Sequence, residues 1–138
     1  MRFVDTNVLL YAASTDPRET KKSRTALALL DATDLALSVQ VLQEFFVQAT
    51  RASRADRLSH AQAAGLVEAF LRFPVQETTP AVMRDAIAIC ERHRLSYWDS
   101  AILAAARALG CDVVLTEDLA HGRSYDGVRV ENPFRARA

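Results

Sequence analysis

The sequence predicts an α/β fold in which a mostly parallel central sheet of four to five short strands has helices on both faces. Short strand-like runs alternate with amphipathic helical segments along the chain, and this order builds parallel sheets. Half of the 138 residues are hydrophobic, which is enough to form a core. No Pro-, Gly- or Ser-rich stretch separates two units, so residues 1–138 are expected to form a single domain.

The expected elements follow from runs of β-branched and apolar residues for strands and from helical periodicity for helices. In chain order the expected strands are residues 2–5 (RFVD), 35–38 (LALS), 74–76, 112–116 (DVVLT) and 127–133 (GVRVENP). The expected helices are residues 7–13, about 18–32, 39 to about 51, 60–73, 80–93 and about 97–109.

Residues that start and stop helices stand at these boundaries. Thr6 or Asn7 can cap the first helix, and Ser59 can cap the helix that follows it at residue 60. Pro80 suits a first helical turn, because the N–H that proline lacks is not needed there. Gly110 is a usual residue just after a helix end.

Composition narrows the class of protein. The longest apolar run, residues 101–106, is far shorter than the roughly 20 residues of a membrane span, and the N-terminus lacks the features of a secretory signal. Cys90 and Cys111 stand apart, as free thiols do in a reducing compartment. We therefore expect a cytoplasmic protein with no membrane partner. The net charge is zero, although 15 of the 17 basic residues are arginine, which is suited to local phosphate contacts.

Four acidic residues interrupt segments that otherwise read as core. Asp5 and Asp118 each follow a strand, Glu44 lies in an apolar helix, and Asp99 leads the buried stripe of another helix. Burying a carboxylate without a partner costs on the order of several kcal/mol. Because ligands gather beyond the carboxyl ends of parallel strands, these acids could converge on a pocket for a divalent metal.

Each acid also has an ordinary structural explanation when it is taken alone. Asp99 fits a capping-box-like turn at a helix start, and Glu44 fits the solvated rim of a helix. Asp5 could be a turn residue, and either Glu117 or Asp118 could cap the next segment. No single position decides between the structural and the catalytic interpretation.

Taken together, the motifs resemble the PIN domain, specifically the VapC-type toxins of bacterial toxin–antitoxin pairs. The resemblance rests on FVDTNVLLYA, on the glutamate in VLQEFF, on YWDSAILAAA, and on VVLTEDLAHG followed by DGVRVENPF. It covers nearly the whole chain, and the motifs stand in the family's order. It implies a PIN-like α/β fold with one PIN domain over residues 1–138.

The resemblance also implies a metal-dependent endoribonuclease that acts on RNA. Four acids are implied to bind Mg²⁺ or Mn²⁺ and to catalyse cleavage: Asp5, Glu44, Asp99 and Asp118. Three neighbours are expected to support them: Thr116, Thr6 and Asn7. Glu117 is carried over only as a possible supporting group behind the metal ligands. A VapB-like antitoxin that covers the acidic groove and a homodimer are further implications.

Four carboxylates in one pocket would require a bound cation. Two carboxylates about 4 Å apart repel by roughly 4 kcal/mol at an effective dielectric near 20, so four cannot all stay ionised without a cation. Mg²⁺ prefers oxygen ligands and keeps several waters. A bound metal lowers the pKa of such a water, which can then attack a phosphodiester.

Two alternatives stay open: a DNA-directed nuclease with the same site, and a non-catalytic RNA-binding regulatory PIN module. Two other classes of protein are excluded, because residues that their active sites need are missing from this sequence. A phosphoaspartyl phosphatase would want a second aspartate where Asn7 stands, and a receiver domain would need a lysine late in the chain, whereas the lysines are Lys21 and Lys22. The three histidines lie in no recognisable catalytic constellation.

Overall fold

The structure is a computed structural model that describes residues 1–135, and it confirms the predicted α/β class. Six strands form one sheet in the order β3-β2-β1-β4-β6-β5. The strands are β1 (Arg2–Val4), β2 (Leu35–Ser38), β3 (Val75–Gln76), β4 (Val113–Leu115), β5 (Ser124–Tyr125) and β6 (Val128–Glu131). The helices are α1 (Thr6–Ala13), η1 (Pro17–Glu19), α2 (Thr20–Leu30), α3 (Val39–Ala49), α4 (His60–Phe70), α5 (Pro80–His93) and α6 (Tyr97–Ala108).

All neighbouring strands from β3 to β6 pair in parallel, and only β5 runs antiparallel, against β6. β5 is one strand more than the four to five expected. It arises from a tight hairpin whose turn residues, Asp126 and Gly127, have φ values of 49° and 88°. Aspartate tolerates this left-handed conformation and glycine adopts it freely. A two-residue strand carries too little pattern to be recognised in the sequence.

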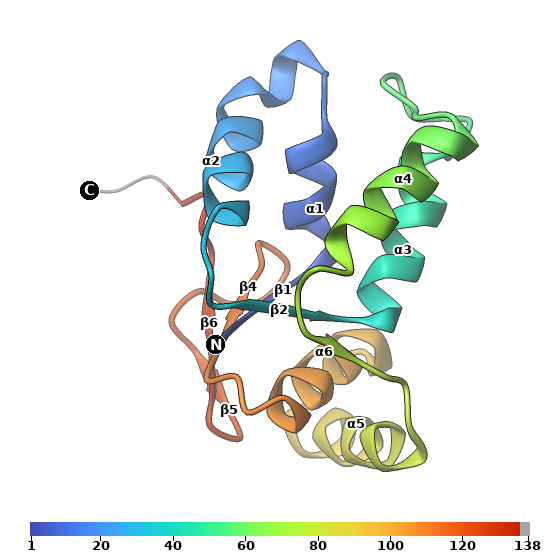
Figure 1. Cartoon of the computed structure of the whole chain (residues 1–138). Coiled ribbons are helices and arrows are strands. Elements are labelled where there is room, and N and C mark those ends of the chain that lie inside the picture. Colours follow the sequence, from blue (N-terminus) through green and yellow to red (C-terminus); the bar gives the residue numbers. More distant parts are fainter. Residues whose placement is uncertain (136–138) are drawn as a thin grey trace.

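Helices cover both faces of the sheet, as expected (Figure 1). Helices α1, α2, α3 and α4 lie on one side, and α5 and α6 lie on the other. Helix α6 is the most deeply packed, since every residue from Ser100 to Ala106 is buried. Asp99 therefore stands at the start of a helix that is held firmly against the sheet.

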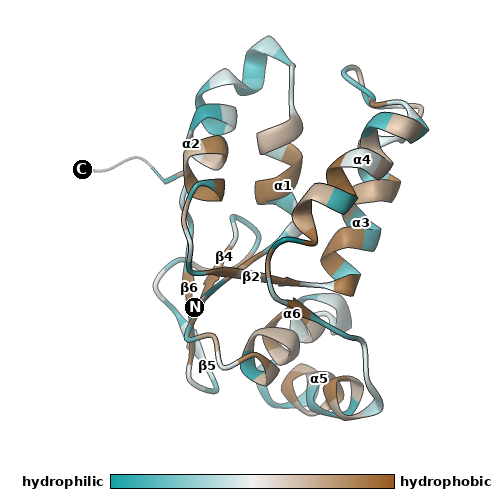
Figure 2. Cartoon of the chain, viewed as in Figure 1, coloured by the Kyte–Doolittle hydropathy of each residue, from teal (hydrophilic) through white to brown (hydrophobic). Residues whose placement is uncertain are grey.

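The core lies between the sheet and these helices. Its largest fully buried side chains include Phe3, Phe45, Leu103 and Leu115. Figure 2 shows hydrophobic residues along the strands and hydrophilic residues in the connecting loops. Burial of each large apolar side chain contributes about 1.5–3 kcal/mol, so this core fixes where the strand ends lie.

The first helix begins one residue earlier than expected, and its cap is Asp5 rather than Thr6 or Asn7. The Asp5 side chain accepts a hydrogen bond from the Thr6 backbone N–H, and Asp5 has extended backbone angles. Aspartate is among the best capping residues, because its carboxylate satisfies an N–H that has no partner within the helix. Thr6 and Asn7 thus belong to the first turn, which leaves their side chains available for other contacts.

The helix expected over about 18–32 is shorter. Asp16 caps the 3₁₀ turn η1, and α2 then runs only from Thr20 to Leu30. The Asp16 carboxylate accepts from the Arg18 N–H and fixes this tighter turn. The capping assignments at Ser59 and Pro80 are confirmed, with a complete capping box between Ser59 and Gln62.

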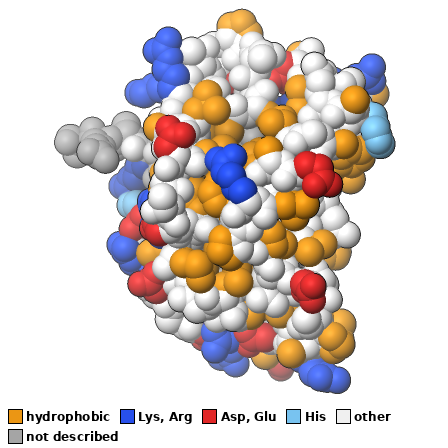
Figure 3. Space-filling model, viewed as in Figure 1, with side chains coloured by type: hydrophobic (Ala, Val, Ile, Leu, Met, Phe, Trp, Pro, Cys, Tyr) orange, Lys and Arg blue, Asp and Glu red, His pale blue; other side chains and the backbone are white. Residues whose placement is uncertain are grey.

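The surface carries both signs of charge. On the face shown in Figure 3, acidic and basic side chains are interspersed and neither sign forms a continuous patch. This distribution agrees with a net charge of zero. Among residues 1–135, no helix combines the length and the apolar character needed to cross a membrane.

Replacing Leu103 by alanine should lower the free energy of unfolding by about 2–5 kcal/mol, because it leaves a cavity under α6. Leu27→Ala is the matched control, since Leu27 also lies in a helix but is 52% exposed, and it should change stability by no more than about 0.5 kcal/mol. Urea unfolding of both variants measures the difference. Equal losses would show that α6 is not anchored by this side chain.

Candidate active site

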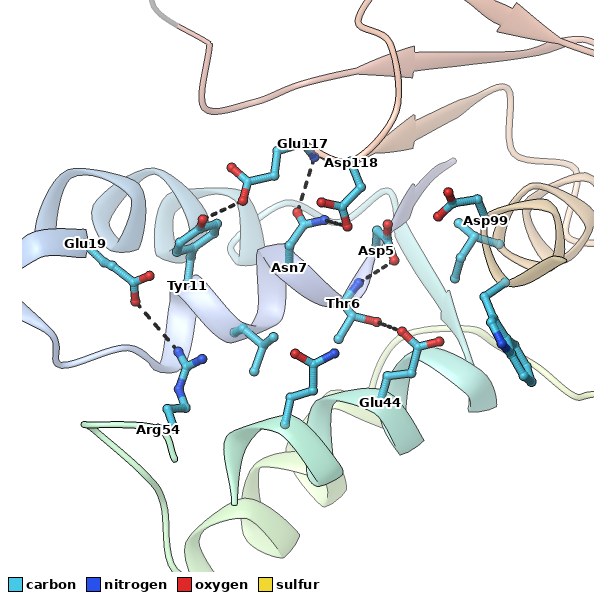
Figure 4. Close-up of a pocket in the computed structure, with 14 residues that line it drawn as sticks. Asp5, Thr6, Asn7, Tyr11, Glu19, Glu44, Arg54, Asp99, Glu117 and Asp118 are labelled. Carbon is cyan, nitrogen blue, oxygen red and sulfur yellow. Dashed lines mark hydrogen bonds and ion pairs between the residues drawn. The ribbon is translucent and has the colours of Figure 1, made fainter. Parts of the chain in front are cut away.

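One pocket gathers six carboxylates from five elements or their ends, beside the carboxyl ends of β1 and β4 (Figure 4). The six acids are Asp5, Glu19, Glu44, Asp99, Glu117 and Asp118. All four acids singled out in the sequence are in this set. They come from the end of β1, from α3, from α6 and from the segment after β4. Folding therefore brings together residues that are separated by up to 113 positions (5 to 118).

Asp5 is the innermost of these acids and is only 5% exposed. Its backbone N–H donates to the Leu115 carbonyl at 3.1 Å, which ties the ends of β1 and β4 together. Its carboxylate accepts from the Thr6 N–H at 2.7 Å and from the Thr116 hydroxyl at 2.8 Å. Burial raises the pKa of Asp5 to about 7, although the two hydrogen bonds act in the opposite direction. The nearby charges of Asp118 and Glu44 add to the rise.

Glu44 is held by two neutral donors. The Thr6 hydroxyl donates to one carboxylate oxygen at 3.0 Å, and the Gln40 amide donates to the other at 2.7 Å. Gln40 lies one helical turn before Glu44, so α3 itself positions the carboxylate. Thr6 joins Asp5 to Glu44, because its N–H donates to the Asp5 carboxylate and its hydroxyl donates to the Glu44 carboxylate.

Asp99 stands in the first turn of α6. The Ser96 side chain accepts from the Asp99 N–H at 3.1 Å and caps the helix. Ser96 therefore caps the helix as expected, but the Asp99 carboxylate does not complete a capping box. In the part of the chain that the structure describes, no hydrogen bond reaches the Asp99 carboxylate, and Figure 4 shows this side chain on the rim facing Asp5.

Asn7 and Thr116 connect Asp118 to the buried end of the pocket. The Asn7 amide nitrogen donates to the Thr116 hydroxyl and to Asp118, both at 3.0 Å. The Thr116 hydroxyl also accepts from the Asp118 N–H at 3.0 Å. Thr116 is fully buried, so its three hydrogen bonds fix the segment that carries Asp118 relative to Asp5.

Glu117 points away from the other acids and toward a cation. The Lys22 ammonium lies 2.9 Å from the Glu117 carboxylate and 3.2 Å from the Tyr11 hydroxyl. The Tyr11 hydroxyl donates to Glu117. Burial raises the pKa of Tyr11, and the neighbouring Glu117 raises it further, so this hydroxyl stays a donor. Glu117 is thereby neutralised at the edge of the pocket.

Ion pairing divides the six acids into two groups. Glu117 pairs with Lys22, and Glu19 lies 3.7 Å from Arg54. The other four, which are the acids predicted from the sequence, form no ion pair with any residue of the described range 1–135. The unbalanced negative charge of the pocket is therefore concentrated at the four acids predicted from the sequence.

The donor set suits Mg²⁺ or Mn²⁺ in type, because all four groups are hard oxygen ligands. Within residues 1–135, however, no three acidic, histidine or cysteine side chains are already arranged to hold one ion. Asp5, Glu44 and Asp118 instead rest on neutral donors. Binding an ion at a common point therefore requires a change of rotamer by some of these side chains. The pocket, of about 270 Å³, lies just below the range of about 300–1,000 Å³ that is typical of small-molecule sites.

Several lining residues escaped the sequence analysis. Leu10 and Tyr11 share a helical face with Asn7, and Gln48 shares one with Glu44. Helical periodicity from the predicted residues could have found these three. Glu19 carries no such signal, because it comes from a 3₁₀ turn whose position only the folded chain defines. Arg54 belongs to a run of arginines after the Glu44 helix that suggests substrate contact (Arg51, Arg54 and Arg57), but the sequence does not show which of them enters this pocket.

The metal-free protein should lose stability as the pH rises from about 4 to about 7, because of Asp5. Its folded pKa of about 7 lies above the ordinary 3.8, so the folded state keeps a proton that the unfolded state has lost. The contribution is complete below pH 3.8 and disappears as the pH passes 7. At about 1.4 kcal/mol per unit of pKa, the effect is on the order of a few kcal/mol.

Denaturant unfolding in EDTA at several pH values measures this effect. Because other groups also contribute to the pH dependence of stability, the quantity to compare is the difference between the wild type and Asp5→Asn. In Asp5→Asn the free energy of unfolding should no longer show the fall between about pH 4 and 7 that Asp5 causes. Asp31→Asn, at an exposed position, should still show it. Parallel curves for the wild type and Asp5→Asn would refute the assignment.

Comparison with known proteins identifies the fold. The family model described as PIN domain matches residues 2–125. A toxin–antitoxin complex from Klebsiella pneumoniae has a TM-score of 0.69 at 20% identity, covering 96% of this chain and 98% of that chain. Mycobacterium tuberculosis VapC20, a sarcin-ricin loop cleaving toxin, has a TM-score of 0.65 at 22% identity, with coverages of 86% and 92%.

DNA-bound VapBC from Salmonella typhimurium has a TM-score of 0.64 at 20% identity and covers 96% of this chain and 97% of that chain. No curated protein matches the sequence. The sequence resemblance and the fold thus point the same way, and the match to the family model extends over most of the residues. The chain belongs to the PIN domain family.

Proposed function

We propose that this protein is a metal-dependent endoribonuclease and the toxin of a VapBC-like toxin–antitoxin pair. The observation that carries the proposal is the group of four acids without cationic partners in one pocket of a PIN domain. A pocket with this charge repels a phosphodiester unless a cation intervenes. A structural role alone does not explain why Asp99, Glu44 and Asp118 should face a buried Asp5 from three other elements.

The four acids and their three neighbours have different roles in the proposed site. Asp5 is the anchored ligand, because the Thr6 N–H and the Thr116 hydroxyl fix both of its oxygens. Glu44 and Asp118 are the adjustable ligands, since each rests on a side-chain amide that can turn away. Asp99 is the ligand that has no competing donor within residues 1–135. Asn7, Thr6 and Thr116 position these acids and exchange no proton with the substrate.

Mg²⁺ or Mn²⁺ would supply two positive charges for the carboxylates and the phosphate and would make a water sufficiently nucleophilic near neutral pH. The raised pKa of Asp5 is consistent with such a site. A cation would lower this pKa again, because it stabilises the ionised carboxylate. The chain itself contributes the orientation of the carboxylates and the exclusion of water around Asp5.

The choice of RNA rests on the sequence resemblance to VapC-type toxins and on VapC20, the sarcin-ricin loop cleaving toxin of the same fold. A DNA-directed nuclease would use the same four acids. A non-catalytic RNA-binding module is disfavoured by electrostatics, because a binder of phosphate gains nothing from four unpaired carboxylates.

An antitoxin partner and a homodimer are part of the proposal. The solved structures from Klebsiella pneumoniae and Salmonella typhimurium are toxin–antitoxin assemblies. In this chain, the unpaired acids of the pocket provide the complement for a basic segment of such a partner. Arginine would suit them best, because its planar fork can pair bidentately with a carboxylate.

Purified protein should cleave labelled RNA, but not single-stranded DNA, in Mg²⁺ or Mn²⁺, and EDTA should stop the reaction. Asp99→Asn should lower the rate by at least about a hundredfold, because it weakens ion binding and phosphate stabilisation. Asp112→Asn is the control, since Asp112 is exposed and lies outside the pocket. Equal cleavage of DNA would favour the DNA nuclease, and unchanged activity of Asp99→Asn would refute the assigned site.

Metal binding can be measured without activity. A ligand that binds only the folded state stabilises it by about 2.7 kcal/mol at a hundred times its dissociation constant. The unfolding temperature should therefore rise with Mn²⁺ concentration in the wild type and in Asp112→Asn. Asp99→Asn should require more Mn²⁺ for the same rise. A rise that is identical in all three proteins would place the ion elsewhere.

A further inference from the structure

Arg54 is the cationic member of the acidic pocket. It comes from the loop between α3 and α4, and among the residues that line this pocket in the described chain it is the one arginine or lysine. Its side chain is only 24% exposed. A cation this deeply set beside six carboxylates needs a reason beyond solvation, since arginine usually keeps its head in water.

The loop that carries Arg54 is tied down next to the pocket. Asp56 accepts from the Ser14 hydroxyl and from the Thr15 N–H, both at 3.0 Å, and so fixes the loop to the end of α1. The Arg54 guanidinium lies 3.0 Å from Asp56 and 3.7 Å from Glu19. These ion pairs orient the guanidinium, and Figure 4 shows it directed toward Glu19 at the end of the pocket opposite Asp99.

The N–H donors of Arg54 remain available. Arg107 uses one nitrogen to bond both oxygens of Asp85, at 2.7 and 2.8 Å, and Arg2 bonds both oxygens of Asp34. In contrast, neither ion pair of Arg54 has hydrogen-bond geometry, and no hydrogen bond from its guanidinium to another residue of the range 1–135 is present. The guanidinium is therefore held in position, while its N–H groups remain free to donate hydrogen bonds to a ligand.

We propose that Arg54 binds a backbone phosphate of the substrate on one side of the phosphate that is cleaved at the four acids. This inference rests on the function proposed above and adds a substrate-binding residue to it. The pocket then has two parts, a metal-dependent part around Asp5 and an end where Arg54 supplies one positive charge beside Glu19. The ligand class is a single-stranded polynucleotide, which presents phosphates in series along its backbone.

The charge distribution explains why such a contact is needed. A strand that enters this pocket passes six carboxylates, and an ion bound among Asp5, Glu44, Asp99 and Asp118 neutralises only the part near the scissile phosphate. The next phosphate would face Glu19 and Glu117. Glu117 already has Lys22 as its partner, so Arg54 is the group that offsets the remaining repulsion. Its fork matches two phosphate oxygens.

The test uses full-length protein and a labelled single-stranded RNA oligonucleotide in Mn²⁺, with Arg54→Gln compared with Arg57→Gln. Arg57 is exposed on the same loop and lies outside the pocket. Loss of a charged hydrogen bond should raise KM of Arg54→Gln about ten- to hundredfold with little change in kcat. The slope of log(kcat/KM) against log salt should become shallower by about 0.7. Arg57→Gln should behave as the wild type.

Two further variants separate binding from a structural role. Asp56→Asn weakens the anchor of the loop but keeps the cation, so it should leave the salt slope unchanged. Arg54→Lys keeps the charge, so the salt dependence of its kcat/KM should equal that of the wild type, whereas its KM should lie between those of the wild type and Arg54→Gln. If Asp56→Asn reproduces the full defect of Arg54→Gln, including the slope, Arg54 acts only by holding the loop, and the proposal is wrong.

The remaining outcomes are distinct for the two proposals. If the wild type cleaves RNA and Arg54→Gln matches it in KM and salt slope, the phosphate contact is refuted while the nuclease assignment stands. If the wild type cleaves no RNA in any metal, the proposed function fails and the assignment of Arg54 fails with it.

Discussion

The rest of the site depends on a single constraint, the burial of the Asp5 carboxylate at the carboxyl end of β1. At 5% exposure its pKa rises to about 7, because few groups around it can replace water. The first turn of α1 and the Thr116 hydroxyl supply the replacements. Within the frame that the core sets, these hydrogen bonds join the start of α1 and the residue after β4 to the end of β1.

Neutral donors extend this arrangement outward. Thr6 joins Asp5 to Glu44, and Asn7 joins Thr116 to Asp118, so each acid is held without being neutralised. Among residues 1–135, the cations that pair with acids of this pocket are Lys22 and Arg54, which face Glu117 and Glu19. Ion pairs thus balance the outer charges of the pocket, whereas the four inner acids have no cationic partner among residues 1–135. This division fits an enzyme that must bind a metal reversibly better than it fits a structural ion-pair network.

The fold was accessible from the sequence because each long element carries its own signal. The helix with Ser59 at its start has a capping box, and the buried stripe of α6 has a clear helical period. The differences from the prediction concern the cap of α1 and two elements that are set by few residues. The strand β5 has two residues, and η1 depends on Asp16 closing a 3₁₀ turn ahead of α2. Such short elements are decided by single hydrogen bonds, which periodicity does not detect.

The sequence by itself predicted the four acids that the fold gathers in one pocket, since a carboxylate in an apolar run is visible without the structure. It also indicated Thr116 and Asn7, through the resemblance to a known family. Only the tertiary structure decided that Thr116 bonds to Asp5 across 111 positions and that Arg54 enters the same pocket as Glu19. The physical reason is that hydrogen-bond partners and loop positions depend on how the strands and helices pack, whereas the cost of burying a charge depends on the residue itself.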